Sequence, residues 1–436
     1  MQRILLSLGL CLVLVPAQAA EPAAEADEPA TAAAQGERVA VEEIRRFVSV
    51  FRAVKQAYVE PVDDATLMRS AIRGLLAGLD PHSSYLDAAQ ARELEEAAEG
   101  AYDGLGLEVV QNADRSLTVV APIDGTPAAR AGLLPGDVIV RIDGVPIEAD
   151  SVEAAVESMR GPPGTTIRLS VLREGRAEPL EFELTRETIR VASVRARWLE
   201  PGLAYARIAA FQADTAGELR RQLEALAGER PVAGLVLDLR SNPGGLLAAA
   251  VETADLFLER GLIVRTRGRL PQARSEVEAR PGDLLHGAPV VILIDAGTAS
   301  ASEVLTGALR DHRRALVMGQ TSFGKGSVQT VLPIDNGDAI KLTTARYYTP
   351  NGTSIQASGI EPDIVLPERV RLSQDAGAAS ALRERDLPGH LPAEVAASAA
   401  AGDASGEVGD FALREAHNLL KGLVVFRAQP APSGGP

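Results

Sequence analysis

The spacing of the apolar residues changes along the chain, and each spacing admits a different kind of fold. In the first part they recur every three or four positions, which predicts amphipathic helices. Short alternating runs follow, as in a small β domain, and after them apolar strands alternate with helices. The chain is therefore expected to be a multidomain α+β protein with a helical N-terminal region (37–99), a β module (100–187), an α/β core (188–369) and a low-complexity segment that ends in a C-terminal helix (370–436).

The N-terminal residues indicate export from the cytoplasm. Arg3 precedes an apolar stretch over 4–15, and Pro16-Ala17-Gln18-Ala19 supplies an A-x-A cleavage pattern, which together predict a signal peptide over 1–19. The apolar run is shorter than the roughly 20 residues that span a bilayer, although an uncleaved anchor is the alternative. We therefore expect a periplasmic protein, free or held at the membrane, with a flexible acidic linker over 20–36.

Cysteine usage and net charge exclude two kinds of chemistry. The single cysteine, Cys11, lies inside the predicted signal and follows Leu10, where a lipoprotein signal has a small residue. The mature chain is therefore expected to use neither disulfides nor thiol chemistry. The net charge of −15 argues against a nucleic-acid partner, because neutralising phosphates requires clustered Lys and Arg.

Three helices are expected before the β module. The first begins near Val39, and the second runs from about Asp64 to Leu79 with its apolar residues on one stripe. Asp80-Pro81-His82-Ser83-Ser84-Tyr85 ends the second helix, since proline stops it there. A third, charged helix is expected from about Ala88 to Ala98.

The β module begins near Gly104-Leu105-Gly106-Leu107, and the order of its parts resembles a PDZ domain. One short helix has Thr126 as N-cap, and a second, capped by Ser151, carries Val152 and Val156 at a spacing that can line a groove. In PDZ domains the N–H groups of the glycine-containing loop hold a carboxylate, and the bound peptide adds a strand. The resemblance implies that the loop residues Leu105, Gly106 and Leu107 bind the C-terminus of another protein.

Two other interpretations of this loop can be compared with it. A dinucleotide-binding loop fails, because Val109 stands where the third glycine is required. A glycine-rich hairpin in an ordinary β domain, with the second helix as plain core, stays open.

Strands and helices alternate through the core, which predicts an α/β fold. The expected strands are 203–209, 232–239, 290–294, 316–318 and an edge strand at 340–347, and the expected helices are 214–226, 247–259, 300–312 and, in the tail, 411–426.

A serine and a lysine stand in surroundings that suit a serine–lysine hydrolase. Ser300 follows a buried strand and a turn of small residues and begins a helix, where active sites of α/β sheets tend to lie. Lys325 lies between two glycines, and a dry site there could lower its pKa from about 10.4 to near 7, as a base requires. Gln329, four residues later, could orient the lysine by an amide hydrogen bond.

Other assignments compete for the same residues. His312, the nearest histidine, lies about 18 Å from Ser300 along the predicted helix, too far for a Ser-His-Asp triad. Ser300 and Glu303 also form a capping box, so a purely structural role stays open. The segment Gly319–Gly326 has the spacing of a phosphate loop, but Gly326 stands where Ser or Thr must bind magnesium, and a strand pattern follows.

Donors for an oxyanion hole are expected on a second loop. The segment 238–245 follows a buried strand, and its paired glycines let backbone N–H groups approach a substrate carbonyl. With the N–H of Ala301 they would stabilise the oxyanion by about 3–4 kcal/mol per donor. A tight turn without a substrate role is the alternative.

Together these segments resemble the carboxyl-terminal processing proteases, also called tail-specific proteases. The resemblance covers about residues 39–366, through LDPHSSYLD, the PDZ module, LDLRSNPGG, GTASASE, FGKGSVQ and YYTPNGTSIQASGIEPD in that order. It implies a crotonase-like or ClpP-like peptidase core. It also implies that Ser300 is the nucleophile, that Lys325 is the general base and that Gln329 orients the lysine. Gly244 and Ala301 would be the oxyanion donors. Thr298 replaces a serine that many members have, and 370–410 matches no part of the family.

The function implied by the resemblance is an endopeptidase that cleaves envelope proteins with apolar C-terminal tails through an acyl-enzyme, with no metal or other cofactor. The PDZ module would bind the tail and gate access to the site, and an envelope adaptor protein could assist it. Members often assemble through their terminal helices, so a homo-oligomer is expected. A catalytically silent PDZ scaffold and a non-peptidase hydrolase are the alternatives.

Overall fold

The computed structural model describes residues 39–112, 116–147, 152–176, 178–334, 336–367 and 410–428. The predicted signal peptide, the acidic linker, the Ser151 cap and the low-complexity segment before residue 410 lie outside these residues. The chain divides between Ile72 and Arg73 into two compact units. No helix within the described ranges is long and apolar enough to cross a bilayer.

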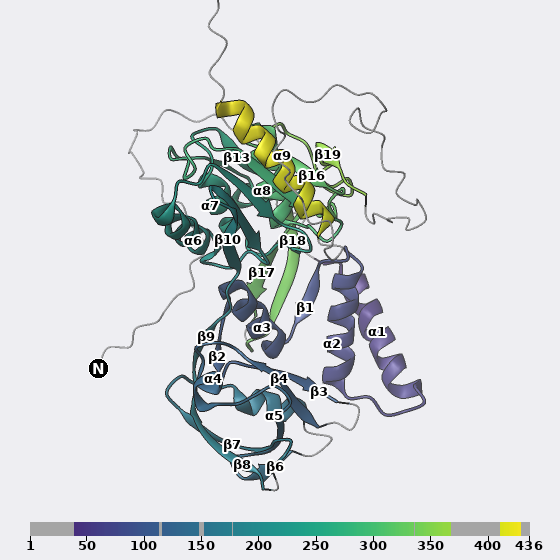
Figure 1. The fold of residues 1–436 in the computed structure, drawn as a ribbon. Helices are drawn as coiled ribbons and strands as arrows, with labels where there is room; N and C mark the ends of the chain where they lie inside the picture. The colour runs from purple at the N-terminus through teal and green to yellow at the C-terminus, as the bar shows by residue number, and fades with distance from the viewer. Residues whose placement is uncertain are drawn as a thin grey trace, which may run out of the picture. The chain divides into compact units, whose positions relative to one another are not determined.

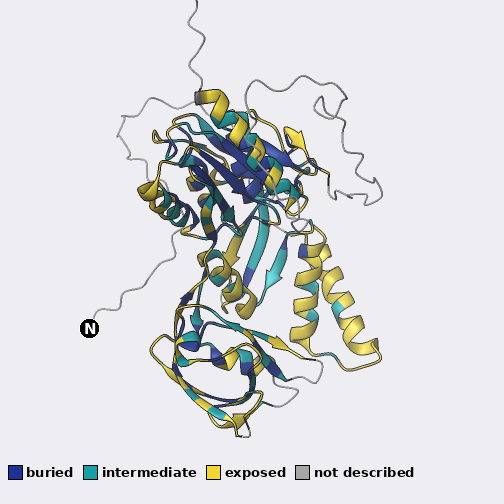
Figure 2. Cartoon of the chain, in the orientation of Figure 1, coloured by how far each residue is buried: buried dark blue, intermediate teal, exposed yellow. Residues whose placement is uncertain are grey.

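The first unit contains α1 (Val41–Ala57) and the beginning of α2 (Asp64–Ala77), both close to where the apolar spacing predicts helices. α1 buries none of its residues, and most of its apolar side chains, including Ile44 and Phe47, are exposed. Figure 2 shows this helix mostly in the colour of exposed residues. α1 therefore presents an apolar face to solvent.

The third predicted helix, α3 (Ala88–Glu99), belongs to the second unit. A capping box between Asp87 and Gln90 begins it, and Gly100, in the left-handed conformation with φ of +70°, ends it. Backbone groups at both ends of the helix, which lack partners within the helix itself, thus find hydrogen-bond partners nearby in the sequence.

The β module is an antiparallel sheet in the order β3-β4-β5-β7-β8, with β6 paired to β5. Its apolar core packs the sheet against two helices. Thr126 occupies the N-cap position of the first helix, as predicted, but its hydroxyl donates to the carbonyl oxygen of Ile123 (2.6 Å) and does not cap the helix. The elements are β3 (Leu107–Gln111), β4 (Leu117–Pro122), α4 (Pro127–Ala131), β5 (Val138–Ile142), β6 (Val145–Pro146), α5 (Val152–Met159), β7 (Thr166–Leu172) and β8 (Leu180–Thr185).

A separate two-stranded ladder joins the start and the end of this module. β2 (Ala101–Gly104) pairs antiparallel with β9 (Glu187–Arg190). The chain leaves β2 at Leu105-Gly106, where Gly106 has a φ of +75°, and enters the sheet of the module at Leu107.

The core contains a six-stranded sheet in the order β10-β11-β12-β15-β16-β19, parallel except for the β10–β11 pair. Alternate residues of β12 face opposite sides: Leu235 and Leu237 pack against α6–α8, whereas Val236 packs against α9. Figure 1 shows α9 lying across one face of this sheet. Helices thus cover both faces, and Figure 2 shows the central strands as buried. The elements are β10 (Val194–Glu200), β11 (Leu203–Ile208), α6 (Thr215–Glu229), β12 (Gly234–Asp238), α7 (Leu247–Asp255), β15 (Val290–Ile294), α8 (Ala301–Asp311), β16 (Ala315–Gly319), β19 (Ile364–Val365) and α9 (Phe411–Ala428).

A second, antiparallel sheet was not foreseen in full. It joins β1 (Ser84–Leu86), β13 (Leu262–Gly268), β14 (Ser275–Glu278), β17 (Ser327–Pro333) and β18 (Ala339–Tyr348). The expectation that 340–347 is an edge strand is wrong, because β18 pairs with β17 along one side and with β1 and β13 along the other. β1 lies about 250 positions earlier in the sequence, so no local pattern indicates this pairing.

Candidate active site

Ser300 lies between the carboxyl end of β15 and the first turn of α8. Its backbone has φ of +56° and ψ of −115°, a conformation that costs a non-glycine residue free energy and recurs at active sites. The following residues of α8, from Ala301 to Leu309, are all buried. A rigid strand and a rigid helix therefore hold this serine in a strained turn.

The carboxylate of Glu303 joins the serine segment to the lysine segment. Glu303 is completely buried. Its Oε2 accepts hydrogen bonds from the backbone N–H of Ser300 (2.7 Å) and of Lys325 (2.9 Å). Its Oε1 accepts from the N–H of Gly324 (2.7 Å) and from the Ser322 hydroxyl (2.6 Å). One side chain thus fixes the two predicted catalytic segments next to each other.

Lys325 is half-buried, and its pKa is lowered below the usual value for lysine. Burial is the main cause, the charge of Lys341 adds to it, and the carboxylate of Glu303 opposes it. Its ammonium group makes no hydrogen bond or ion pair with any described residue, Ser300 included. The surroundings favour the neutral amine that a general base requires.

Gln329 lies on β17 with its amide nitrogen held by two hydroxyl groups. Its Nε2 donates to Ser327 Oγ (2.9 Å) and to Thr343 Oγ1 (3.3 Å). Within the described residues its Oε1 accepts no hydrogen bond, and no bond joins it to Lys325.

The predicted oxyanion loop touches the serine. A Cβ added at Gly244 would lie 2.9 Å from Ser300 Cβ and 3.0 Å from Ala301 N, so only glycine allows this approach. The N–H of Gly244 donates to Asn242 Oδ1 (2.9 Å). The N–H groups of Gly245 and Ala301, by contrast, have no acceptor among the described residues. If Gly244 is an oxyanion donor, as predicted, its N–H must either share its hydrogen bond between Asn242 and the substrate or break the bond to Asn242.

Tyr347 is a residue of this site that the sequence analysis did not single out. Its hydroxyl is buried and has no hydrogen-bond partner among the described residues. Burial, followed by the charge of Glu303, raises its pKa, and the Ser300 hydroxyl acts in the opposite sense. A neutral phenol therefore lies close to the serine.

The loop of the β module leaves backbone donors free. β3 is at the edge of its sheet, and the N–H groups of Leu105 and Gly106 have no acceptor among the described residues. The Leu105 side chain packs in the core, so only its backbone can meet a ligand. Leu107 and Val156 are partly exposed beside that core, whereas the side chain of Val152 is not described. An extended peptide could add to β3 and place its carboxylate at the free N–H groups.

Within the described ranges, no group of three or more His, Cys, Asp or Glu side chains could hold a metal ion. Three segments of the chain match models of known protein families. Residues 202–366 match the model of peptidase family S41, residues 118–173 that of the PDZ domain, and residues 7–90 that of the activating protease CtpB N-terminal domain.

A carboxy-terminal-processing protease of Bartonella bacilliformis is 42% identical over 399 residues, which cover 89% of this chain and 90% of that protein. The chain belongs to the carboxy-terminal processing protease family. It is also 33% identical to the carboxy-terminal processing protease CtpA of Bacillus subtilis over 74% of this chain and 69% of that one. The solved photosystem II D1 C-terminal processing protease shares 32% identity, covering 75% of this chain and 94% of the other, with a TM-score of 0.43. As a member of this family, the chain is a serine-type peptidase.

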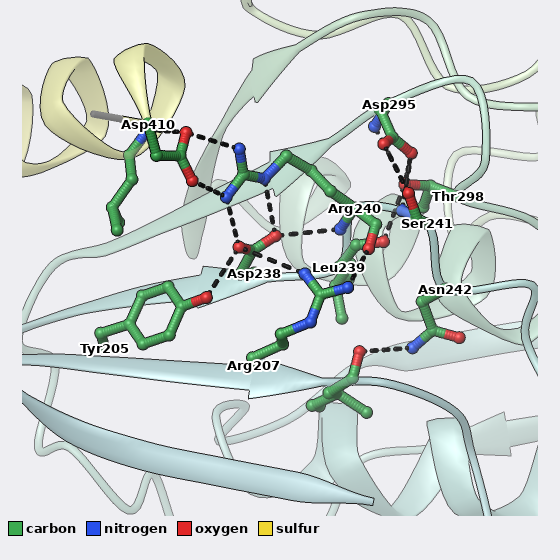
Figure 3. A network of polar contacts seen from close by, with 12 residues as sticks. Tyr205, Arg207, Asp238, Leu239, Arg240, Ser241, Asn242, Asp295, Thr298 and Asp410 are labelled. Carbon is green, nitrogen blue, oxygen red and sulfur yellow. Dashed lines mark hydrogen bonds and ion pairs between the residues drawn. The ribbon is translucent and has the colours of Figure 1, made fainter. Parts of the chain in front are cut away.

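In this member of the family, a polar network supports the segment 238–245, which is the predicted oxyanion loop (Figure 3). Asp238 is completely buried, and its carboxylate accepts hydrogen bonds from Tyr205 Oη (2.9 Å) and from the Arg240 side chain (2.6 and 2.9 Å). Arg207 forms an ion pair with the same Asp238 carboxylate (3.5 Å) and donates a hydrogen bond to the backbone carbonyl of Arg240 (3.0 Å). Arg240 also binds both oxygens of Asp410, just before α9 (2.8 and 2.5 Å). The network thus connects the loop before Gly244 to the C-terminal helix of the peptidase.

We expect Asp410→Asn to loosen α9 by about 0.5–1 kcal/mol at pH 7, a small cost because solvent screens this partly exposed pair. The hydrogen bonds from Arg240 are the first cause that holds the pKa of Asp410 below its usual 3.8. This stabilisation is therefore present above pH 3.8 and is lost as the pH falls through the folded-state pKa. Hydrogen exchange should show less protection of α9 in Asp410→Asn than in the unmodified protein at pH 7, and equal protection in the two proteins in acid.

Glu415→Gln is the matched control, because among the described residues Glu415 forms an ion pair with its neighbour Arg414 alone, on α9 itself. Equal protection of α9 in Asp410→Asn and in the unmodified protein at pH 7 would contradict this anchoring role.

We expect Gly106→Ala to weaken the binding of a peptide with a free apolar C-terminus at least about tenfold, because an alanine at this φ is strained. Its Cβ would also lie 2.3 Å from Thr126 Cβ. Gly125→Ala, at a φ of +74° with no atom within 4 Å, is the control for backbone strain alone. Fluorescence anisotropy with a labelled peptide measures both, and equal affinities of the two variants would be evidence against the loop as the binding site.

Proposed function

We propose that this peptidase is a cell-envelope endopeptidase that captures the C-terminal tails of substrate proteins with its PDZ module and cleaves them with Ser300 as nucleophile and Lys325 as general base. The observation that carries the proposal is the bond pattern of Glu303, whose single carboxylate binds the backbone N–H of both residues. The lowered pKa of Lys325 supports its role as the base.

The reaction would be an acyl transfer in two steps. Neutral Lys325 takes the Ser300 proton as the hydroxyl oxygen attacks the peptide carbonyl, and the lysine then protonates the leaving amine. Water, deprotonated by the same lysine, releases the acyl group from Ser300. The N–H of Ala301, free in this structure, would stabilise the oxyanion together with Gly244 once its bond to Asn242 is shared. Gln329 would orient Lys325 through its unused Oε1.

The PDZ module would select the substrate. Within the described residues β3 is an edge strand and the N–H groups of Leu105 and Gly106 have no acceptor, which supports recognition of a terminal carboxylate. Leu107, Val152 and Val156 would contact an apolar last residue. The names of the relatives, which are carboxy-terminal processing proteases, point to the same class of substrate.

Three further features belong to the proposal. The signal peptide predicted over 1–19 supports a periplasmic location, where an adaptor protein could bring substrates to the peptidase. The exposed apolar face of α1 supports a homo-oligomer. The mostly parallel sheet with helices on both faces supports a crotonase-like or ClpP-like core.

Incubation of the mature chain with an unstructured protein that has an apolar C-terminus tests the proposal. Mass spectrometry should find cleavage by the unmodified chain and none by Ser300→Ala, which should still bind the tail. Equal cleavage by both would overturn the assignment of Ser300. Binding of the tail without cleavage by either would favour the PDZ scaffold.

A further inference from the structure

We propose that Asp80 and Thr343 are positioning residues that determine which end of the Gln329 amide is presented to Lys325. This inference rests on the roles proposed above for Gln329 and Lys325. It also gives a function to LDPHSSYLD, a segment that the proposed reaction does not otherwise use.

A register shift between β17 and β18 places Thr343 directly opposite Gln329. Val328 pairs with Ala345, but the next residue, Gln329, pairs with Thr343, so that Thr344 is the extra residue of a bulge. Without the bulge, Gln329 would face Thr344. Directly opposite residues are the pairs whose side chains meet most closely on a sheet, and Gln329 Nε2 accordingly lies 3.3 Å from Thr343 Oγ1.

The turn after α2 fixes the hydroxyl of Thr343. The Thr343 hydroxyl donates to Asp80 Oδ1 (3.1 Å), and the Thr343 N–H donates to Ser83 Oγ (3.1 Å). The Asp80 carboxylate itself is held by the N–H groups of His82 (2.8 Å) and Ser83 (2.9 Å) and by the Ser83 hydroxyl (2.7 Å). Since a carboxylate only accepts, the single proton of the Thr343 hydroxyl is used on Asp80.

It follows that Thr343 can only accept a hydrogen bond from Gln329. The two ends of a glutamine amide have the same shape but opposite hydrogen-bonding character. Thr343 therefore requires the Nε2 end of Gln329 on its side, and Nε2 uses its second proton on Ser327 Oγ (2.9 Å). Ser327 alone would not decide this, because its hydroxyl could equally donate to Oε1. The selection comes from Thr343 with Asp80 behind it.

This orientation leaves Oε1 as the unused end of the amide. The oxygen can accept a hydrogen bond from an N–H of the lysine amine, which aims the nitrogen lone pair toward Ser300, and it can stabilise the ammonium that forms after proton transfer. A flipped amide would present N–H donors to a nitrogen that must itself remain an acceptor. The orientation of Gln329 thus acts on the chemical step more than on the binding of substrate.

We expect Thr343→Val to lower kcat for peptide cleavage about tenfold and to change KM less than about twofold, since one orienting hydrogen bond is worth roughly a factor of ten at most. Thr343→Ser, which keeps the hydroxyl, should retain most of the activity. Asp80→Ala frees the Thr343 proton without replacing a residue of β17 or β18, and it should lower kcat about threefold. Thermal unfolding identifies any variant that fails to fold.

A double-mutant cycle separates positioning from general damage. If Thr343 acts through Gln329, then Thr343→Val should cause no further loss of kcat in a Gln329→Ala background. The same loss in both backgrounds, or a folded Thr343→Val with unchanged kcat, would overturn the inference. Ser300→Ala in the same assay keeps the two proposals distinguishable. Residual cleavage by Ser300→Ala would refute the proposed function. An inactive Ser300→Ala together with a fully active Thr343→Val would refute only the positioning role.

Discussion

Replacing Lys325 by methionine is expected to lower kcat for peptide cleavage about a thousandfold while the protein stays folded. Methionine keeps much of the length and apolar character of the side chain but cannot accept a proton, and general-base catalysis commonly contributes a factor of about 10² to 10⁴. Steady-state cleavage of a tail peptide measures the loss, and circular dichroism checks the fold. Activity within tenfold of the unmodified enzyme would contradict the role of Lys325 as the base.

Lys341→Met is the matched control for this variant, because it removes a neighbouring positive charge but leaves the base in place. Lys341 contributes to the lowered pKa of Lys325, after the larger effect of burial. The ascending limb of the pH–rate profile should lie below pH 10.5 in the unmodified enzyme and should move to higher pH in Lys341→Met. An unchanged limb would mean that a different group is titrating.

The same shift has a consequence for stability. Between the folded-state pKa of Lys325 and 10.5 the unfolded chain holds more protons than the folded one, so the free energy of unfolding rises with pH across this window. The cost of burying the ammonium is present in full below the window and is relieved above it. Lys325→Met removes this dependence and should unfold at a higher temperature than the unmodified protein at pH 7, with the difference shrinking toward pH 10.5.

Glu303→Gln is expected to have the second largest effect, with about 3 kcal/mol lost from the free energy of unfolding and a loss of activity of at least about a hundredfold. Each carboxylate oxygen of Glu303 accepts two hydrogen bonds. Glutamine has only one oxygen, so its NH₂ group would face the N–H groups of Ser300 and Lys325 in one orientation and the N–H group of Gly324 in the other. The segments of Ser300 and Lys325 would then lose their common anchor.

Glu218→Gln provides the comparison for Glu303→Gln. Glu218, on α6, also accepts hydrogen bonds from two backbone N–H groups and a hydroxyl, but all three go to one oxygen, Oε2. Glutamine can therefore retain them, and we expect little loss of stability and unchanged kcat. Chemical denaturation and peptide cleavage measure both variants. Equal behaviour of the two would show that Glu303 has no special part in the site.

The sequence was sufficient for features that depend on local pattern. The strand, the turn of small residues and the helix around Ser300 are contiguous, and so are the two glycines beside Lys325. Glu303, by contrast, was recognised only as part of a capping box, because its bonds to Gly324 and Lys325 cross a long gap in the sequence. No local pattern shows that Glu303 is the residue that assembles the site.

Long-range contacts explain the differences at β18 and Tyr347, whereas a local bond explains the difference at Gly244. β18 was expected at an edge because its own sequence alternates in polarity, and its partner β1 lies in a distant segment. Gly244 was expected to offer a free N–H, but Asn242, two residues earlier, accepts it. Tyr347 has an ordinary strand position in the sequence, and only the fold brings its hydroxyl next to Ser300.

Covalent labelling followed by intact-protein mass spectrometry tests the central claim, that Lys325 activates Ser300, most directly. A fluorophosphonate probe reacts only with an activated serine, and peptide mapping locates the adduct. We predict one adduct on Ser300 in the unmodified protein, none in Ser300→Ala, and labelling of Lys325→Met slower by about the factor lost in kcat. An adduct on another residue, or labelling of Lys325→Met at the rate of the unmodified protein, would contradict the claim.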